Sequence, residues 1–466
     1  MKLTLNIFHF SLFIFHFFAI IVLATGCAQI GAPTGGAKDS IPPVLIKATP
    51  ENGSINISNN KITLTFDEYI DVRDAQTNVL VSPYPKANPI IDYRLKTVTI
   101  RLKDTLLPNT TYSIDFGNAI RDNNEGNPFK NFTYVFSTGS TIDSLQLTGK
   151  VILAENGKID TTMTAMLYKI GDDSMVQKRK PDYIARLNNE GEFVFKNLAA
   201  GSYNVYALKD GDGGKTYNSP IESFAFLNEP IILPQGDSVP VMYAYTEEKD
   251  TKKSTSSPSS AANDKRLRYT TSINTSFQDL LSDLEINFSK PLKDLDKAKI
   301  ILTDTNYKSV NYTLVPDSIQ KNITLKTKWV PDTDYKLIIS KDAATDSAGN
   351  QIFKTDTLSF KTKGIADYGG LTIRFTNLGK SHQVLQFFQN DELKKSVPIV
   401  NAQWSDKLFP PGDYELRILY DTNNDGKWTP GNYSKKKQPE KVVTLDKRLA
   451  IKANWDNERE IQLIDN

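Results

Sequence analysis

Short stretches in which apolar and polar residues alternate recur along the chain from residue 41 onward. In the first of the domains proposed below they read KITLTF at 61–66, TVTIRL at 97–102, TYSIDF at 111–116 and NFTYVF at 131–136. Successive side chains of a strand point to opposite faces, so a period of two indicates strands with one buried face. Their Thr, Val, Ile and aromatic content, bounded by Asn, Gly and Pro, is typical of antiparallel β-sandwiches.

One pattern of turn and strand occurs twice. The turn PNTTY at 108–112 has a counterpart, PDTDY, at 331–335, and each is followed by Gly-Asn, at 126–127 and 349–350. Each copy then ends in an aromatic strand that is closed by Thr and Gly. We therefore expect domain A (41–140) and domain A′ (268–364) to be copies of one fold.

The segments that follow these two copies also match each other. GSY at 201–203 and GDY at 412–414 are each followed by an Asp seven residues after the Tyr, and by an acidic turn that contains Gly. They predict a second repeated pair, domain B (141–248) and domain B′ (365–466). The chain is thus expected to be all-β, with tandem antiparallel β-sandwiches in the order A-B-A′-B′ and an elongated multidomain form. Residues 249–267 divide the halves, and their Ser, Thr, Lys and Ala content predicts a disordered linker.

The N-terminus predicts a secretory signal at 1–26. Lys2 precedes a long apolar run, and the small residues of LATG lead directly to Cys27, the one Cys of the chain. A transmembrane anchor is the alternative, because about 20 apolar residues span a bilayer. The LATGC pattern resembles the lipobox of bacterial lipoproteins, which implies that Cys27 becomes the lipid-carrying first residue. The Gly- and Pro-containing residues 27–40 would then form a flexible tether.

Composition argues against several functions. The net charge is +2, without the clustered basic surface that a nucleic-acid partner requires, so we expect none. Lipidation of Cys27 would leave no thiol for a disulfide, a zinc-thiolate site or a nucleophile. Removal of the signal would leave His382 as the single His, and no phosphate loop or nucleophile elbow is evident. We therefore expect a protein that is not an enzyme.

Several segments resemble known domain families. PPVLIKATPENGS at 42–54, ITLTFDEYID at 62–71 and LPNTTY at 107–112 resemble bacterial Ig-like domains of the S-layer-associated type, although A′ lacks the Pro-Pro start and the first turn. GEFVFKNLAAGSYNVYA at 191–207 is similar to prealbumin-like or carboxypeptidase-regulatory-like sandwiches, and B′ carries only the second half of that pattern, FPPGDYELRILYD at 409–421. The layout resembles Ig-like outer-membrane lipoproteins of the Bacteroidota envelope. This resemblance implies binding, spacing or scaffolding.

The most specific candidate site is the segment DTNNDGK at 421–427. Asp421, Asn423, Asp425 and Lys427 stand at the alternate positions of a calcium loop, in which oxygen ligands surround a hard cation and Gly allows a sharp turn. The alternative is a tight polar loop between strands, because Asp, Asn and Gly are common turn residues. A weaker candidate in domain B contains Asp210 and Asp212.

Two aromatic residues, Trp428 and Tyr433, lie beside this loop. They could stack on a sugar or contact a partner, or they could cover the end of a sandwich. Paired carboxylates for glycoside hydrolysis are conceivable in DEYID at 67–71, but acidic residues at strand ends are common in this Ig-like type.

The functional expectation is a non-catalytic envelope lipoprotein that acts as a scaffold or protein-binding module. One concrete form is an accessory subunit of an outer-membrane assembly or transport complex, which binds another envelope protein through sheet edges. The alternative is a carbohydrate-binding or glycan-processing accessory. We favour the periplasmic leaflet of the outer membrane over the cell surface, because no acidic stretch closely follows Cys27.

Overall fold

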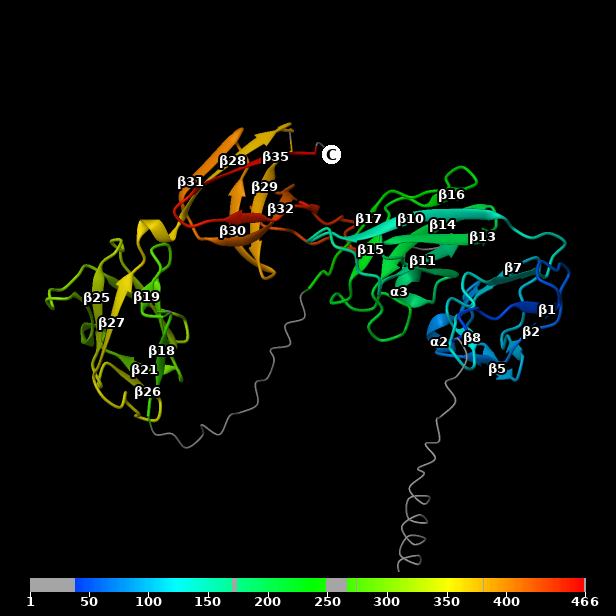
Figure 1. Cartoon of the computed structure of the whole chain (residues 1–466), viewed down its shortest axis with the longest axis horizontal. Coiled ribbons are helices and arrows are strands. Elements are labelled where there is room, and N and C mark those ends of the chain that lie inside the picture. Colours follow the sequence, from blue (N-terminus) through cyan, green and yellow to red (C-terminus); the bar gives the residue numbers. More distant parts are fainter. Residues whose placement is uncertain (1–37, 170–173, 249–265, 274, 380, 465–466) are drawn as a thin grey trace, which may run out of the picture. The chain divides into compact units, whose positions relative to one another are not determined.

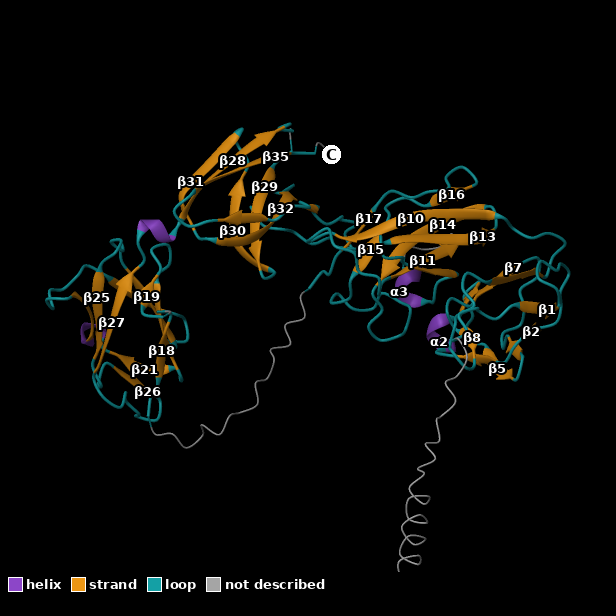
Figure 2. Cartoon of the chain, viewed as in Figure 1, coloured by secondary structure: helices purple, strands orange, loops and turns teal. Residues whose placement is uncertain are grey.

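The computed structural model describes residues 38–169, 174–248, 266–273, 275–379 and 381–464. The signal sequence, Cys27, most of the tether and nearly all of the linker lie outside the described residues, so those expectations stay predictions. The chain divides into two compact units, Met1–Ile142 and Asp143–Asn466. Strands dominate both units (Figures 1 and 2), which confirms the all-β class.

Domain A consists of two main sheets around one apolar core. Its strands are β1 (Leu45–Thr49), β2 (Lys61–Phe66), β3 (Ile70–Val72), β4 (Leu80–Ser82), β5 (Ile90–Arg94), β6 (Thr97–Arg101), β7 (Thr111–Asp115), β8 (Ile120–Asp122) and β9 (Thr133–Ser137). The sheet orders are β1-β2-β6-β5 and β4-β7-β9, and β3 pairs with β8. Ile62, Leu64 and Phe66 of β2 are buried and the residues between them are not, as the alternation predicted.

Domain A′ repeats this arrangement. Its strands are β18 (Tyr269–Thr271), β19 (Phe277–Gln278), β20 (Leu284–Phe288), β21 (Leu292–Leu295), β22 (Ile300–Asp304), β23 (Thr313–Pro316), β24 (Asn322–Lys326), β25 (Asp334–Ile339), β26 (Ala344–Asp346) and β27 (Asp356–Thr362). The orders β18-β20-β24-β23 and β19-β27-β25-β22, with the pair β21-β26, correspond to those of domain A. The first strand of A′ is short, consistent with the missing Pro-Pro start.

Domain B has a three-stranded and a five-stranded sheet. Its strands are β10 (Leu145–Leu153), β11 (Thr164–Lys169), β12 (Tyr183–Arg186), β13 (Glu192–Leu198), β14 (Gly201–Leu208), β15 (Phe224–Phe226), β16 (Ile231–Leu233) and β17 (Met242–Ala244). The orders are β13-β10-β17 and β12-β11-β14-β15, with β16 also paired to β14. The pair β10 and β17 is parallel.

Domain B′ follows the same plan. Its strands are β28 (Gly369–Thr376), β29 (Gln383–Gln389), β30 (Glu392–Pro398), β31 (Gln403–Phe409), β32 (Gly412–Tyr420), β33 (Val442–Thr444), β34 (Leu449–Ile451) and β35 (Asp456–Gln462). The orders β31-β28-β35 and β30-β29-β32-β33, with β34 paired to β32, repeat those of domain B. The repeat therefore extends over the whole of B′, although only the second half of B′ carries the sequence pattern that we noted in domain B.

The described helices are short. They are α2 (Ala75–Asn78), α3 (Met175–Lys178), η2 (Lys297–Lys299) and η3 (Ile365–Asp367). Within the described ranges, no helix has the length and apolar character needed to cross a membrane.

Candidate functional site

The two predicted metal loops begin at equivalent places in domains B and B′. Each follows the long central strand that starts with Gly-x-Tyr, β14 in B and β32 in B′, and each leads to the next strand of the same sheet, β15 or β33. Tyr203 and Tyr414 are buried in the two cores. The strand thereby fixes the position of the Asp that follows it, Asp210 or Asp421.

Asp421 has its carboxylate directed into its own loop. The side chain is buried, and its two oxygens accept the backbone N–H of Gly426 at 2.8 Å and that of Asp425 at 3.3 Å. Asp425 in turn accepts the backbone N–H of Lys427 at 2.7 Å, and the Asn423 side chain donates to Asp425 at 3.2 Å. These contacts form the polar turn that the sequence left as an alternative. Calcium binding at this loop stays a prediction.

Glu440 is a second buried carboxylate of this loop that sequence reasoning did not select. It is 2% exposed. One oxygen accepts the backbone N–H and the hydroxyl of Thr422, both at 2.8 Å, and the other accepts the backbone N–H of Thr429 at 2.9 Å. Its counterpart in domain B is Glu222, since each Glu stands two residues before the next strand. Aligning the two repeats at those strands would have revealed both residues.

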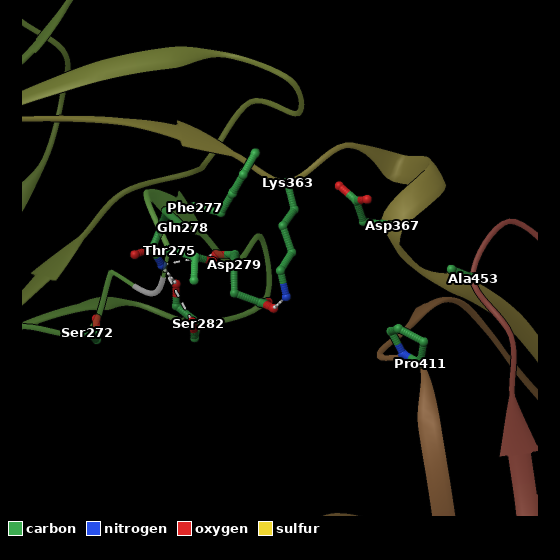
Figure 3. A pocket seen from close by; sticks show the side chains of 10 residues that line it. All are labelled: Ser272, Thr275, Phe277, Gln278, Asp279, Ser282, Lys363, Asp367, Pro411 and Ala453. Carbon is green, nitrogen blue, oxygen red and sulfur yellow. Dashed lines mark hydrogen bonds and ion pairs between the residues drawn. The ribbon is translucent and has the colours of Figure 1, made fainter.

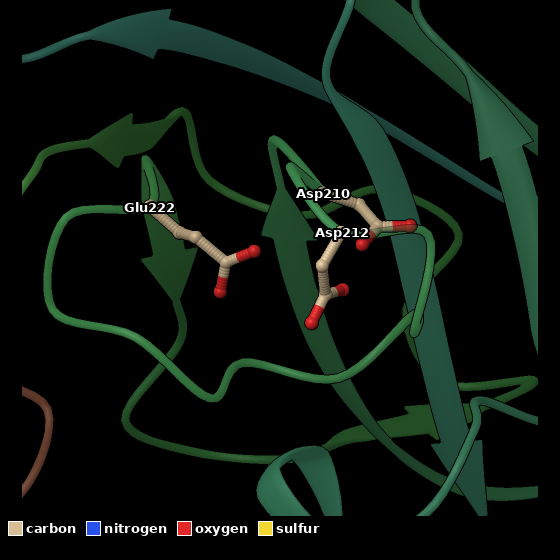
Figure 4. A group of neighbouring side chains, drawn as sticks. All are labelled: Asp210, Asp212 and Glu222. Carbon is tan, nitrogen blue, oxygen red and sulfur yellow. The ribbon is translucent and has the colours of Figure 1, made fainter.

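In domain B the carboxylates of Asp210, Asp212 and Glu222 converge (Figure 4). One oxygen of each carboxylate lies within 4.8 Å of the corresponding oxygens of the other two. Within the described ranges, this is the trio of acids spaced closely enough to hold a metal ion. Carboxylate oxygens are the ligands that Ca²⁺ prefers. The structure thus gathers more acids in the loop that the sequence ranked second. Metal binding by Asp210 and Asp212 stays a prediction.

A basic side chain already neutralises part of the trio. The ammonium of Lys215 lies 2.7 Å from Asp210, whose side chain is 4% exposed. The Asn218 amide donates to Asp212 at 2.7 Å, and together with the Gly214 N–H it lowers the pKa of Asp212 below its ordinary value. The loop is therefore held by an internal cation and by hydrogen bonds.

For Tyr433 the sequence left two interpretations open, a contact with a ligand or partner and a ring that covers the end of a sandwich. The side chain is only 4% exposed. Its ring packs edge-to-face on aromatic rings of domain B at centroid distances of 5.1 Å to both Phe224 and Phe226 and 6.0 Å to Tyr206. A ring enclosed in this way has no face for a sugar. The alternative interpretation, an aromatic residue that covers the end of a sandwich, fits the structure, and the covered sandwich is that of domain B.

Polar contacts fix the same loop on domain B. The carboxylate of Glu247 accepts the backbone N–H of Tyr433 and the side-chain amide of Asn432, each at 2.9 Å. The Gln438 amide donates to the Phe226 carbonyl at 3.1 Å. Gly431 lies so close to Tyr245 that a Cβ would stand 2.6 Å from its ring, so a larger residue would clash. We call residues 429–440 the docking loop.

Two further contacts join domains B and B′. The backbone N–H of Val442 donates to the Ala154 carbonyl at 2.9 Å, and Lys158 forms an ion pair with Asp391 at 3.0 Å. Domains B and B′ are therefore in contact although A′ separates them in the sequence.

Trp428 is half-buried in domain B′. Its indole N–H donates to the Glu440 carbonyl at 2.8 Å, and its ring packs on the small cluster of Val384, Leu419 and Val442. Its ligand contact stays a prediction, and these contacts give the ring a structural role.

The acids at 67–71 have local partners. Asp67 accepts the backbone N–H of Val44 at 2.8 Å, and Asp71 accepts from Arg73 at 2.7 Å. The bond from Arg73 lowers the pKa of Asp71, whereas burial, followed by the neighbouring acids, raises the pKa of Glu68. The His382 backbone carbonyl accepts a hydrogen bond from the Asp421 N–H at 2.9 Å.

A cavity that the sequence did not suggest lies where A′ joins B′ (Figure 3). Its volume is about 560 Å³, and Phe277, Asp279, Lys363 and Asp367 contribute to its lining. Lys363 pairs with Asp279 at 2.8 Å. The buried Tyr368 accepts the Leu280 N–H at 2.8 Å and so ties the first residues of B′ to A′.

Comparison with known proteins identifies two of the four domains. Residues 39–138 and 254–362 match the family model of the bacterial Ig-like domain. These stretches correspond to domains A and A′, so the chain contains tandem bacterial Ig-like domains. A search of the curated proteins found no match.

Several solved structures are similar to parts of the chain. One is alpha-2-macroglobulin from Escherichia coli, with 17% identity over 38% of this chain and 69% of that chain, at a TM-score of 0.19. Another is BcpA, the major pilin subunit of Bacillus cereus, with 12% identity over 69% of this chain and 99% of that chain, at 0.16. The N-terminal part of the bacterial S-layer protein SbsC has 16% identity over 38% of this chain and 42% of that chain, at 0.17.

Proposed function

We propose that this protein is a non-catalytic scaffold of the bacterial cell envelope that binds another envelope protein. The observation that carries the proposal is the docking loop, in which Tyr433 is buried among aromatic residues of domain B. A buried aromatic anchor surrounded by hydrogen bonds is the kind of contact that holds domains together. Joining B to B′ would give a chain of sandwiches a fixed frame on which sheet edges can be presented.

The anchoring part of the proposal rests on the sequence. Cys27 would carry lipid and hold the protein at the outer membrane, with the periplasmic leaflet favoured, and the tether would separate the lipid from domain A. The partner would be another membrane protein, for which this chain serves as an accessory subunit of an assembly or transport complex. The glycan-binding alternative loses support, because Tyr433 has no exposed face.

Crosslinking in the native envelope tests this function. The full-length protein is crosslinked in intact cells and captured, and its partners are identified by mass spectrometry. A Cys27→Ala variant serves as the control for the anchor. Enrichment of one defined outer-membrane protein, reduced in the variant, is the expected result. Recovery of the monomer alone, at crosslinker doses that join known neighbours of the same membrane, would contradict the proposal.

A further inference from the structure

Among the described residues, β18 forms one edge of a four-stranded sheet of domain A′ (Figure 1). This strand is the last of the order β23-β24-β20-β18. The Arg268 carbonyl accepts from Ser289 at 2.8 Å and the Ser272 N–H donates to Glu285 at 2.9 Å, so the even-numbered residues face β20. In an antiparallel ladder the odd-numbered residues then direct their N–H and C=O away from it. Tyr269 and Thr271 thus present backbone groups on the outer side.

A groove runs along this outer side. It has a volume of about 380 Å³ and lies between residues 266–271 and the segment 352–358. The N–H of Leu267 donates to the Gln351 carbonyl at 3.0 Å, which closes one end of the groove. Apolar surface in the groove comes from Leu358 and from Phe353, which is 74% exposed. An exposed edge with an adjacent apolar surface is the arrangement to which a partner strand adds.

The lining of the groove is basic. Arg266, Arg268 and Lys354 contribute three positive charges, and the Arg266 guanidinium lies 5.8 Å from the centre of the Phe353 ring. The one acid in the lining, Asp356, accepts a hydrogen bond from the Tyr269 hydroxyl at 3.0 Å. The net charge of the groove favours an acidic occupant.

Domain A differs at the same position. Its strand β1 pairs Leu45 with Phe66 as β18 pairs Tyr269 with Phe288, so the residues equivalent to Arg266 and Arg268 are Pro42 and Val44. There the Asn127 amide donates to the carbonyls of Asp39 and Ile41, whereas in A′ the Asn350 amide donates to Asp346. The two arginines at the edge of A′ therefore have no basic counterpart at the equivalent positions of domain A.

We propose that the β18 groove binds an extended acidic segment of a partner protein, which adds to the sheet as a further strand. Backbone groups of Tyr269 and Thr271 would pair with the segment, Phe353 would contact its apolar side chains, and the basic residues would contact its acidic ones. This inference rests on the proposed scaffold function and specifies its partner surface.

The probe is a fluorescent eight-residue peptide in which Glu and Val alternate, with a Lys-Val peptide as its counterpart. It is titrated into the full-length protein in detergent and followed by fluorescence anisotropy. Thr271→Pro removes an outward N–H without removing a bond to β20, and Phe353→Ser removes the exposed ring. Each is expected to weaken binding of the acidic peptide about tenfold, the loss typical of an interface anchor. Phe277→Ser, at another exposed Phe of A′, should leave it unchanged.

Equal binding of the two peptides, or unchanged binding in both groove variants, would overturn the inference. The envelope crosslinking separates it from the scaffold function. If a partner is recovered with wild type and lost with Thr271→Pro, both proposals stand. If the partner is recovered equally with both groove variants, the scaffold function stands and the β18 groove is not its binding surface. Melting curves of each variant establish that domain A′ remains folded.

Discussion

The loops that follow β14 in domain B and β32 in domain B′ begin and end with equivalent carboxylates, which we call the frame, and differ in the residues between them. In both, an Asp follows the central strand and a buried Glu stands two residues before the next one, Asp210 with Glu222 and Asp421 with Glu440. In B the loop closes on itself and includes Lys215 as its cation. In B′ the loop is longer, and its second part, the docking loop, carries Tyr433 into domain B.

This difference shows how a repeated domain can acquire a contact without changing its core. The two carboxylates accept backbone N–H groups at both ends of the loop, and such buried acceptors hold the ends of the loop in place. The middle is then able to vary in length. Asp210 and Asp421, two of the acids that suggested metal chemistry in the sequence, are part of this frame.

Removing the Tyr433 ring should have the largest effect on the contact between domains B and B′. Tyr433→Ala deletes a ring packed against four aromatic residues of domain B, and we expect it to cost about 3–5 kcal/mol in the free energy of unfolding of the B–B′ pair. Trp455→Ala, at a Trp of B′ that is 64% exposed, should change this free energy by less than about 0.5 kcal/mol. Urea unfolding of the full-length protein in detergent measures both. Equal stability of the two variants would show that docking by Tyr433 contributes little.

Removal of a frame carboxylate should cause the second largest loss of stability. Glu440→Ala leaves the N–H groups of Thr422 and Thr429 without their acceptor, and we expect a loss of about 1–3 kcal/mol. Glu222→Ala should cost less, because Glu222 accepts from Gly211 and Asn218 over longer distances, 3.1 and 3.3 Å. The same denaturation measurement compares them. A larger loss for Glu222→Ala than for Glu440→Ala would contradict this ranking by hydrogen-bond length.

Lys215 offers a test of what distinguishes the loop of domain B. Lys215→Met removes the ammonium next to Asp210 and leaves three converging carboxylates. Like charges in close proximity favour a cation, so the variant should bind Ca²⁺ more tightly than wild type. Calorimetric titration with CaCl₂ measures the change, and the variant Lys215→Met with Asp212→Asn serves as control. No gain of Ca²⁺ affinity would show that the ammonium does not occupy the place of a metal.

Acid should affect the loop of domain B through Asp212, and this is the smallest expected effect. The Asn218 amide lowers the pKa of Asp212, so the ionised form is stabilised in the folded state. This stability is present above the unfolded pKa of about 3.9 and is lost as the pH falls through the lower folded value. Asn218→Ala should therefore have a lower melting temperature than wild type at pH 5, and the difference should shrink towards pH 2. A difference independent of pH would assign the stabilisation to another group.

Much of the fold followed from the sequence, because a period of two depends only on local geometry. KITLTF at 61–66 is a strand with the predicted buried face, and the repeated turns indicated the paired domains. In B′ only one half of the sequence carries the pattern that we noted in domain B, yet the strand order of domain B is repeated throughout B′. Strand pairing depends on which residues are buried together, and different side chains can fill the same core.

The candidate site was less predictable. DTNNDGK at 421–427 meets the pattern of a calcium loop and also that of a polar turn, since both require short oxygen-bearing side chains and Gly. The burial of Tyr433 could not be predicted, because it depends on domain B, which lies about 200 residues away in the sequence. Glu247 gave no local signal for the same reason.

The most direct test of the account is zero-length crosslinking of the full-length protein in detergent with a carbodiimide. Lys158 of domain B and Asp391 of domain B′ are 3.0 Å apart and exposed to the reagent. At low protein concentration we predict an intramolecular amide between these two residues, detected by mass spectrometry after proteolysis and lost in Tyr433→Ala. Absence of this amide from the wild-type protein, or an equal yield in the variant, would contradict the claim that the docking loop joins B′ to B.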